Sequence, residues 1–145
     1  MCSLMDLLDK QQNIYLVVGA TNNEEKTGFK VFKDLRDTGF EAVAVNARIG
    51  GKEEVYGLPS YDSVSSFLLR VKELFNEERM VQAIQKVVVV FVTPPEQTIE
   101  VLHEAIDHGV RKAWFQPGSE SEEALALCRE NGIVELHSQC IMVSK

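Results

Sequence analysis

Apolar runs alternate with longer amphipathic stretches along this chain. Ile14 to Val18 and Val87 to Val92 are uninterrupted apolar runs, without the alternation of a strand that has one face in water. Strands covered on both faces, as in parallel sheets, have this pattern. We predict two strands here and three more over 41–46, 112–116 and 133–137.

Between the strands, apolar residues recur at helical spacing. The spacing predicts one helix from near Thr27 to just before Gly39, a second over 96–108 and a third over 119–131, each followed by a glycine. Residues 62–86 form a longer helical segment, either one helix or two with a break near Asn76. We expect a loop over 47–61 and a frayed helical turn within 1–10, and the tail 140–143 could add a short edge strand.

This alternation of strands and helices predicts an α/β fold. We expect one domain over residues 1–145, built on a doubly wound, mostly parallel five-stranded sheet with spatial order 2-1-3-4-5 and the helical segment 62–86 as an insertion. Ligands bind such sheets at the carboxyl ends of the strands, where the order reverses. That point lies between the first strand and the Val87 strand, beside the loops 19–26 and 93–95.

Composition narrows the function classes. The net charge of −7 and pI near 5.0 argue against a nucleic-acid partner, which would require a basic surface. The three cysteines, Cys2, Cys128 and Cys140, are far apart and have no metal-type pairing, which favours a reducing compartment and predicts no metal site. The longest apolar run is far shorter than the ~20 residues that span a bilayer, and no signal peptide is recognisable, so we expect a soluble cytoplasmic protein without membrane contact.

The loops of the predicted ligand edge carry the candidate chemistry. After Gly19 the next glycine is Gly28, so the dinucleotide fingerprint G-x-G-x-x-G is absent and the loop by itself is equally consistent with an ordinary turn. The second strand is followed by Asn46, Arg48 and Lys52, where a nicotinamide site usually has an acid. Cations here favour a ribose with an extra phosphate, as in coenzyme A or the phosphorylated nicotinamide cofactor, with a solvated loop as the alternative.

No catalytic group is predicted. The sequence has no Ser-His-Asp arrangement and no acid pair in a defined loop. His103 and His108 are expected at the surface or a helix end. Cys140 lies near the expected ligand side, and we interpret it as a buried structural residue. Glu24 and Glu25 disfavour a phosphate directly over the first loop.

Several short motifs, in order and at characteristic spacing, resemble a known family. They are Val17-Val18-Gly19-Ala20-Thr21, Ala44-Val45-Asn46-Ala47, Gly57-Leu58-Pro59-Ser60-Tyr61, Val92-Thr93-Pro94-Pro95, the stretch 104–112, Phe115-Gln116-Pro117-Gly118, the helix start Glu122-Glu123-Ala124, Asn131-Gly132-Ile133 and Cys140. The chain is similar to the CoA-binding Rossmann domain family, found as standalone CoA-binding proteins and as the N-terminal domain of the succinyl-CoA synthetase alpha subunit. The phosphorylated histidine of that synthetase belongs to another domain, so ligase activity is not implied.

The resemblance implies which residues meet a bound coenzyme A. Gly19, Ala20, Thr21 and Asn22 would meet the pyrophosphate and the start of the pantetheine, and Asn46, Arg48 and Lys52 the adenosine phosphate. Thr93, Pro94, Pro95, Gln116 and Gly118 would line the rest of the crevice. Three departures stand out. Ala44 and Ala47 stand where the family has prolines, and Glu24-Glu25 stands where a basic or neutral loop would suit the ligand better. The segment from Ser63 to Lys86 is longer than usual, so that it could cover the site or bind a partner.

These observations together favour non-catalytic binding of coenzyme A or an acyl-CoA. Two alternatives stay open: an oxidoreductase that uses an NADP-type nucleotide, and a scaffold or interaction protein that has lost the ligand and assembles through the apolar face of 64–84. A homodimer or a protein partner is compatible with either a binder or a scaffold.

Overall fold

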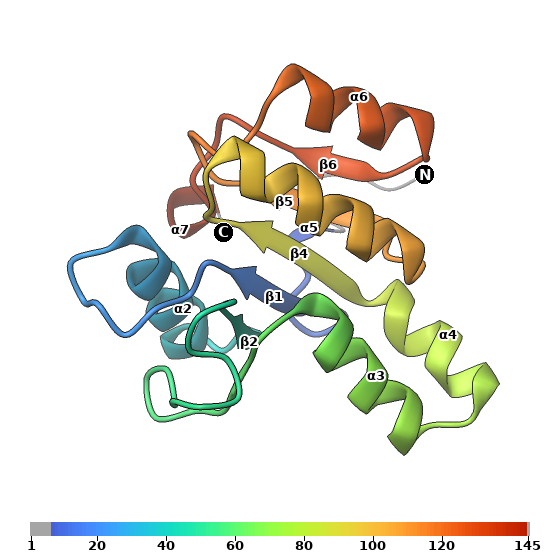
Figure 1. The fold of residues 1–145 in the computed structure, drawn as a ribbon, viewed down its shortest axis with the longest axis horizontal. Helices are drawn as coiled ribbons and strands as arrows, with labels where there is room; N and C mark the ends of the chain where they lie inside the picture. Colours follow the sequence, from blue (N-terminus) through green and yellow to red (C-terminus); the bar gives the residue numbers. More distant parts are fainter. Residues whose placement is uncertain (1–6, 145) are drawn as a thin grey trace.

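The computed structural model describes residues 7–144 and has one parallel sheet with helices on both faces (Figure 1). The strands are β1 Ile14–Val18, β2 Glu41–Val45, β3 Ser60–Tyr61, β4 Val87–Phe91, β5 Lys112–Phe115 and β6 Val134–Leu136. Every neighbouring pair is parallel, in the order β3-β2-β1-β4-β5-β6. The predicted α/β fold and the relative order of the five predicted strands are confirmed.

Within residues 7–144 the sheet has six strands rather than the predicted five. The additional strand, β3, lies in the segment that the sequence predicts as a loop, and it pairs Ser60 with Ala44 and Tyr61 with Val45 at the free edge of β2. Two residues carry no recognisable strand pattern, so this pairing depends on tertiary contacts. Gly50 packs against the backbone of Tyr61 and Asp62 so closely that a Cβ would overlap it, which holds β3 in place.

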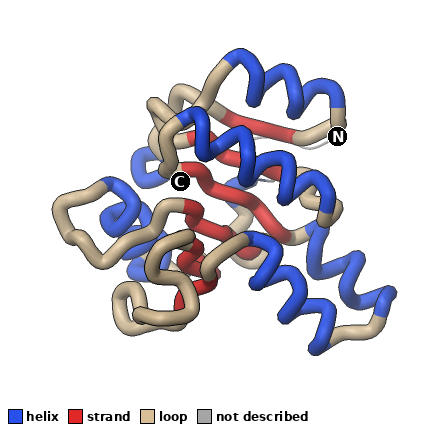
Figure 2. The backbone as a smooth tube through the Cα atoms, in the orientation of Figure 1, coloured by secondary structure: helices blue, strands red, loops and turns tan. Residues whose placement is uncertain are grey.

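Helices form in each of the predicted helical segments, and one more forms in the tail. They are α2 Thr27–Asp37, α3 Val64–Leu74, α4 Glu77–Gln85, α5 Pro95–Asp107, α6 Glu122–Glu130 and α7 Ile141–Ser144 (Figure 2). The segment 62–86 is two helices, the second of the two predicted arrangements. Its break falls where Asn76 caps α4, its Oδ1 accepting from the Arg79 amide at 2.9 Å.

The tail is helical, so its prediction as an edge strand is wrong. The Ile141 amide donates to Gln116 Oε1 at 2.8 Å, and the Ile141 side chain is fully buried, which turns the chain back over the sheet as α7. At the other end, most of the predicted frayed turn lies outside the described residues, whereas Leu7 and Leu8 are helical.

Each face of the sheet has its own apolar core. Leu16 and Val18 of β1 join the core under α3, α5, α6 and the end of α4. Tyr15 and Val17 point the other way, into the core under α2 and α7. The β4 residues are buried throughout, which is why their sequence lacks alternation. The two layers of helices leave the carboxyl ends of the strands as the edge where loops gather.

Two buried groups make the stability of the fold sensitive to alkali. Burial raises the pKa of the Cys128 thiol from 9.0 to about 12 and that of the Tyr15 hydroxyl from 10.0 to about 12. Above pH 9 the unfolded chain loses these protons while the folded chain retains them, so their contribution is complete below pH 9 and lost by about pH 12. We expect the free energy of unfolding to fall over this range, by up to about 1.4 kcal/mol per pH unit for each group.

Denaturant unfolding at pH 8, 10 and 11 measures this fall. Cys128→Ala should show a shallower fall between pH 9 and 10, because it removes the group that titrates first. A free energy of unfolding that is constant to pH 11, or a slope unchanged in Cys128→Ala, would contradict the expectation.

Within residues 7–144, no helix is long and apolar enough to cross a membrane.

Candidate functional site

A cleft of about 800 Å³ opens at the carboxyl ends of β1, β2 and β4. It lies at the point where the strand order reverses, with β2 on one side of β1 and β4 on the other. Its walls are the β1–α2 loop, the segment after β2 and the β4–α5 connection, as predicted for this sheet type. The lining residues are Val18, Gly19, Thr21, Asn23, Glu25, Lys26, Thr27, Gly28, Asn46, Ala47, Arg48, Ile49, Val92, Thr93, Pro94 and Gln97.

Two glycines allow the walls to approach one another. Gly19 has a φ of +102°, and a Cβ there would lie 2.8 Å from the Val92 carbonyl oxygen. A Cβ on Gly28 would overlap the Gly19 carbonyl oxygen. The end of β1, the start of α2 and the end of β4 therefore meet with backbone against backbone, which only glycine permits.

The residues between the two glycines are held by their own hydrogen bonds. Thr21 Oγ1 accepts from the Asn23 amide at 3.3 Å, and Asn23 Oδ1 accepts from the Glu25 amide at 3.1 Å. The Asn23 carbonyl accepts from the Lys26 amide at 3.0 Å. These bonds support the conformation of the loop from within.

The N-terminus of α2 faces this cleft. Lys26 is its N-cap residue, and no side chain caps the helix there. The first amides of a helix have no partner within the helix, and together with the helix dipole they favour an anion. Lys26 and Thr27 line the cleft beside these amides, and Glu25 is the acidic side chain that lines it.

The opposite wall follows β2. Asn46 Nδ2 donates to the Ala20 carbonyl at 2.8 Å, and its Oδ1 accepts from the amides of Arg48 at 2.8 Å and Ile49 at 3.3 Å. The Arg48 side chain is exposed and lines the cleft. A cation therefore stands across the cleft from the start of α2.

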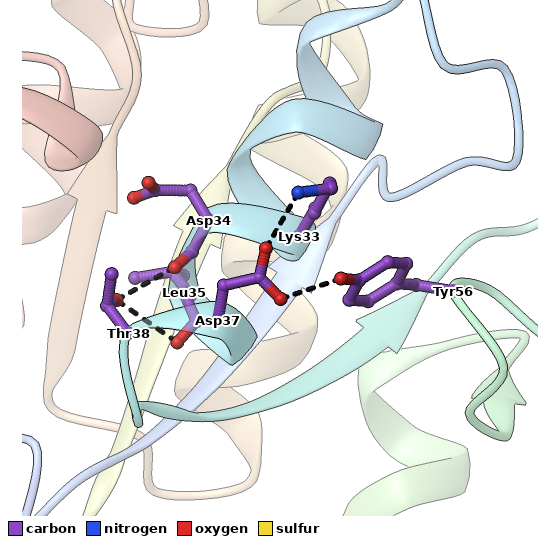
Figure 3. A network of polar contacts seen from close by, with 6 residues as sticks. All are labelled: Lys33, Asp34, Leu35, Asp37, Thr38 and Tyr56. Carbon is purple, nitrogen blue, oxygen red and sulfur yellow. Dashed lines mark hydrogen bonds and ion pairs between the residues drawn. The ribbon is translucent and has the colours of Figure 1, made fainter.

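The rest of the β2–β3 connection is fastened to α2 by Tyr56. Its hydroxyl donates to Asp37 Oδ1 at 2.6 Å, and Lys33 Nζ donates to Asp37 Oδ2 at 2.7 Å (Figure 3). The bond from Lys33 and then the bond from Tyr56 lower the pKa of the Asp37 carboxyl. The Tyr56 ring also packs edge-on against Phe29, at 5.9 Å between centroids. These contacts anchor the far end of the segment that carries Arg48.

A second cavity, of about 570 Å³, continues the cleft toward β5. It shares Thr27, Val92, Thr93 and Pro94 with the first cavity and adds Gln116, Pro117, Gly118, Ser119, Cys140 and Met142. The Gln116 side chain is buried and joins this wall to the tail, because its Nε2 donates to Cys140 Sγ at 3.3 Å. The two cavities form one groove across the ends of β2, β1, β4 and β5.

The structure places eight of the twelve predicted site residues along this groove. Gly19, Thr21, Asn46, Arg48, Thr93 and Pro94 line the first cavity, and Gln116 and Gly118 line the second. Ala20 is fully buried behind the loop, and Asn22 lines a separate open cavity of about 660 Å³ with Tyr56. Lys52 and Pro95 line none of the three cavities. The role of all twelve in binding stays a prediction.

The twelve predicted site residues do not include several that line the cleft at the start of α2. Lys26, Thr27 and Gly28 line the cleft, as does Gln97 from α5. The distance along the chain from Gly19 to Gly28 conceals their direct contact, so the sequence shows Gly28 as the next glycine but not as part of the cleft. The helix start near Thr27 was the available signal.

His, Cys, Asp and Glu side chains do not gather into a metal-binding group of three anywhere in residues 7–144. The groove offers backbone amides and hydroxyls, with Lys26 and Arg48 as its cations and Glu25 as its acid. Such a donor set suits a phosphorylated organic ligand.

Comparisons with known proteins bear on the groove and the fold together. The sequence matches the CoA binding domain family over residues 13–145. It is 25% identical over 141 residues to the uncharacterized protein YneT of Bacillus subtilis (strain 168), covering 97% of this chain and 90% of that protein.

Two solved archaeal structures share the fold. A conserved hypothetical protein from Pyrococcus furiosus is 36% identical, with a TM-score of 0.72 over 92% of this chain and 99% of that one. A hypothetical protein from Pyrococcus horikoshii OT3 is 26% identical, with a TM-score of 0.73 over 97% and 85%. The family match spans nearly all of the sequence and includes both walls of the groove, so this chain belongs to the CoA binding domain family.

Proposed function

We propose that this protein binds coenzyme A or an acyl-CoA in the groove at the carboxyl ends of the strands, without chemical turnover. The observation that carries the proposal is the pair of joined cavities, one of which brings Arg48 and the uncapped start of α2 together. The family supports the class of ligand, and the groove is the proposed binding site.

The two ends of the groove suit the two ends of this ligand. The adenosine and its phosphates would lie over the start of α2 and beside Arg48, where amides and cations favour negative charge. The pantetheine would extend past Thr27 and Thr93 toward Gln116, Cys140 and Met142. Lys26 and Arg48 would outnumber Glu25 beside the phosphates, so we expect binding to weaken as salt screens the attraction of these cations.

Binding without turnover is proposed because the polar side chains of the groove hold its own loops. Thr21, Asn23 and Asn46 bond to neighbouring amides, and Thr93 Oγ1 lies 2.7 Å from Thr98 Oγ1. Gln116 bonds to the tail. These groups build a preformed cradle, and such preorganisation favours affinity.

Calorimetric titration of the purified chain with coenzyme A and with its dephospho form tests the proposal. We expect coenzyme A to bind roughly tenfold more tightly, since a charge-assisted hydrogen bond to an exposed cation contributes about 1.4 kcal/mol. Arg48→Ala should remove most of this preference. Arg79→Ala is the matched control, because Arg79 is exposed on α4 and lines none of the three cavities.

Three results would contradict the proposal. They are no binding of coenzyme A, equal binding of both forms by the wild type, and loss of the preference in Arg79→Ala as well as in Arg48→Ala. Titration with NADP⁺ is a further arm, and tighter binding of NADP⁺ than of coenzyme A would favour the alternative nucleotide.

A further inference from the structure

We propose that Asn46 is a positioning residue, which aims Arg48 and thereby gives the groove its preference for a ligand with a phosphate beside the adenosine. The inference rests on the function proposed above, because it concerns the same groove. It assigns the selectivity to a side chain that touches both walls rather than to Arg48 alone.

The Asn46 side chain joins two loops that are far apart in sequence. Its Nδ2 donates to the carbonyl of Ala20, 26 positions earlier, at 2.8 Å. Its Oδ1 accepts from the Arg48 amide at 2.8 Å and from the Ile49 amide at 3.3 Å. One half-buried side chain thus fixes the turn after β2 relative to the loop after β1.

The bonds of the Asn46 side chain to Ala20, Arg48 and Ile49, here called the clasp, fix the position of the Arg48 backbone. Within residues 7–144, its exposed guanidinium has no hydrogen bond or ion pair of its own, so the bond from the Arg48 amide to Asn46 is what holds this residue at the wall of the cleft. When the backbone that carries an arginine is already held at the wall of the cleft, less backbone entropy is lost on contact with a phosphate. Releasing the turn should therefore weaken the contact between Arg48 and the ligand, even though Arg48 itself is unchanged.

Removing the side chain should leave the fold intact. The Asn46 amide donates to the Tyr61 carbonyl at 2.9 Å, and the Asn46 carbonyl accepts from the Gly50 amide at 2.9 Å. These main-chain bonds, and the pairing of β3 with β2, do not involve the side chain. The alanine variant thus isolates the clasp.

The experiment measures the affinities of coenzyme A and dephospho-coenzyme A for the wild type, Asn46→Ala, Arg48→Ala and the double variant. We expect Asn46→Ala to lose roughly two- to tenfold in affinity for coenzyme A and much less for the dephospho form, in line with the cost of immobilising one flexible side chain. The double variant should show the same preference for coenzyme A over dephospho-coenzyme A as Arg48→Ala, because Asn46 acts through Arg48.

Asn76→Ala is the matched control. It also removes an asparagine side chain that accepts a hydrogen bond from a backbone amide, that of Arg79 at 2.9 Å, but this asparagine caps α4 and is far along the chain. It should lower the unfolding midpoint and leave the preference for coenzyme A unchanged. Hydrogen exchange of the Arg48 and Ile49 amides in the ligand-free protein should accelerate in Asn46→Ala and not in Asn76→Ala. Asn46→Ser, which retains a short acceptor for Arg48, should fall between wild type and Asn46→Ala in both measurements and serves if the alanine variant does not fold.

The outcomes separate this inference from the proposed function. If the wild type prefers coenzyme A and Asn46→Ala retains that preference in full, or if the effects of Asn46→Ala and Arg48→Ala are additive, the positioning role is overturned and the function stands. If the wild type binds neither ligand, the proposed function fails and the positioning role fails with it.

Discussion

Phe91→Ala is expected to lower the free energy of unfolding by about 3–5 kcal/mol. Phe91 ends the central strand β4 and is fully buried, with its ring stacked on that of Phe115 at 5.1 Å between centroids. The substitution removes a large apolar side chain and leaves a cavity in the core beneath α3, α5 and α6. The sheet on one side and the helices on the other are closely packed, so they cannot move in to fill it. Such a loss is a large part of the stability of an ordinary domain of this size.

Phe75→Ala is the matched control, because this phenylalanine is 40% exposed between α3 and α4. The same chemical change there should cost less than about 1 kcal/mol, as at other partly exposed positions. The single tryptophan, Trp114, is fully buried, so its fluorescence reports global unfolding in denaturant titrations of both variants. Equal losses in the two variants would contradict the burial of Phe91.

The second large effect is expected at the glycine contact within the cleft. Gly28→Ala places a methyl group on the carbonyl oxygen of Gly19, and a backbone atom cannot move aside as a side chain end can. We expect a loss of about 2–3 kcal/mol, near the upper end for overpacking, even though alanine is the better helix former by about 1 kcal/mol. Because both glycines line the cleft, we also expect coenzyme A binding to weaken at least tenfold.

Gly132→Ala is the comparison for this prediction. Gly132 has a φ of +67° with open space around the missing Cβ, so alanine there meets conformational strain without a clash. Its cost should be about 1 kcal/mol, with ligand affinity unchanged. A Gly28→Ala protein as stable as the wild type, or less perturbed than Gly132→Ala, would show that Gly28 is not in contact with Gly19.

The local sequence was sufficient to predict most of the sheet and the edge at which the cleft lies. Buried parallel strands are apolar throughout, so Val87 to Phe91 was recognisable without any partner. The glycines and prolines that follow the strands also marked their ends, because Pro94 and Pro95 begin α5. The motifs around Gly19, Asn46 and Thr93 pointed to a family that the sequence match bears out.

Tertiary structure decided what depends on contacts between distant segments. β3 forms because β2 offers a free edge, and the tail becomes α7 because Gln116 holds the Ile141 amide. The pairing of Gly19 with Gly28 and the clasp of Asn46 on Ala20 likewise join residues with no local pattern in common. Hydrophobic periodicity records which face of an element is buried, but it does not record which backbone atoms meet across a loop, and those meetings shape the candidate groove.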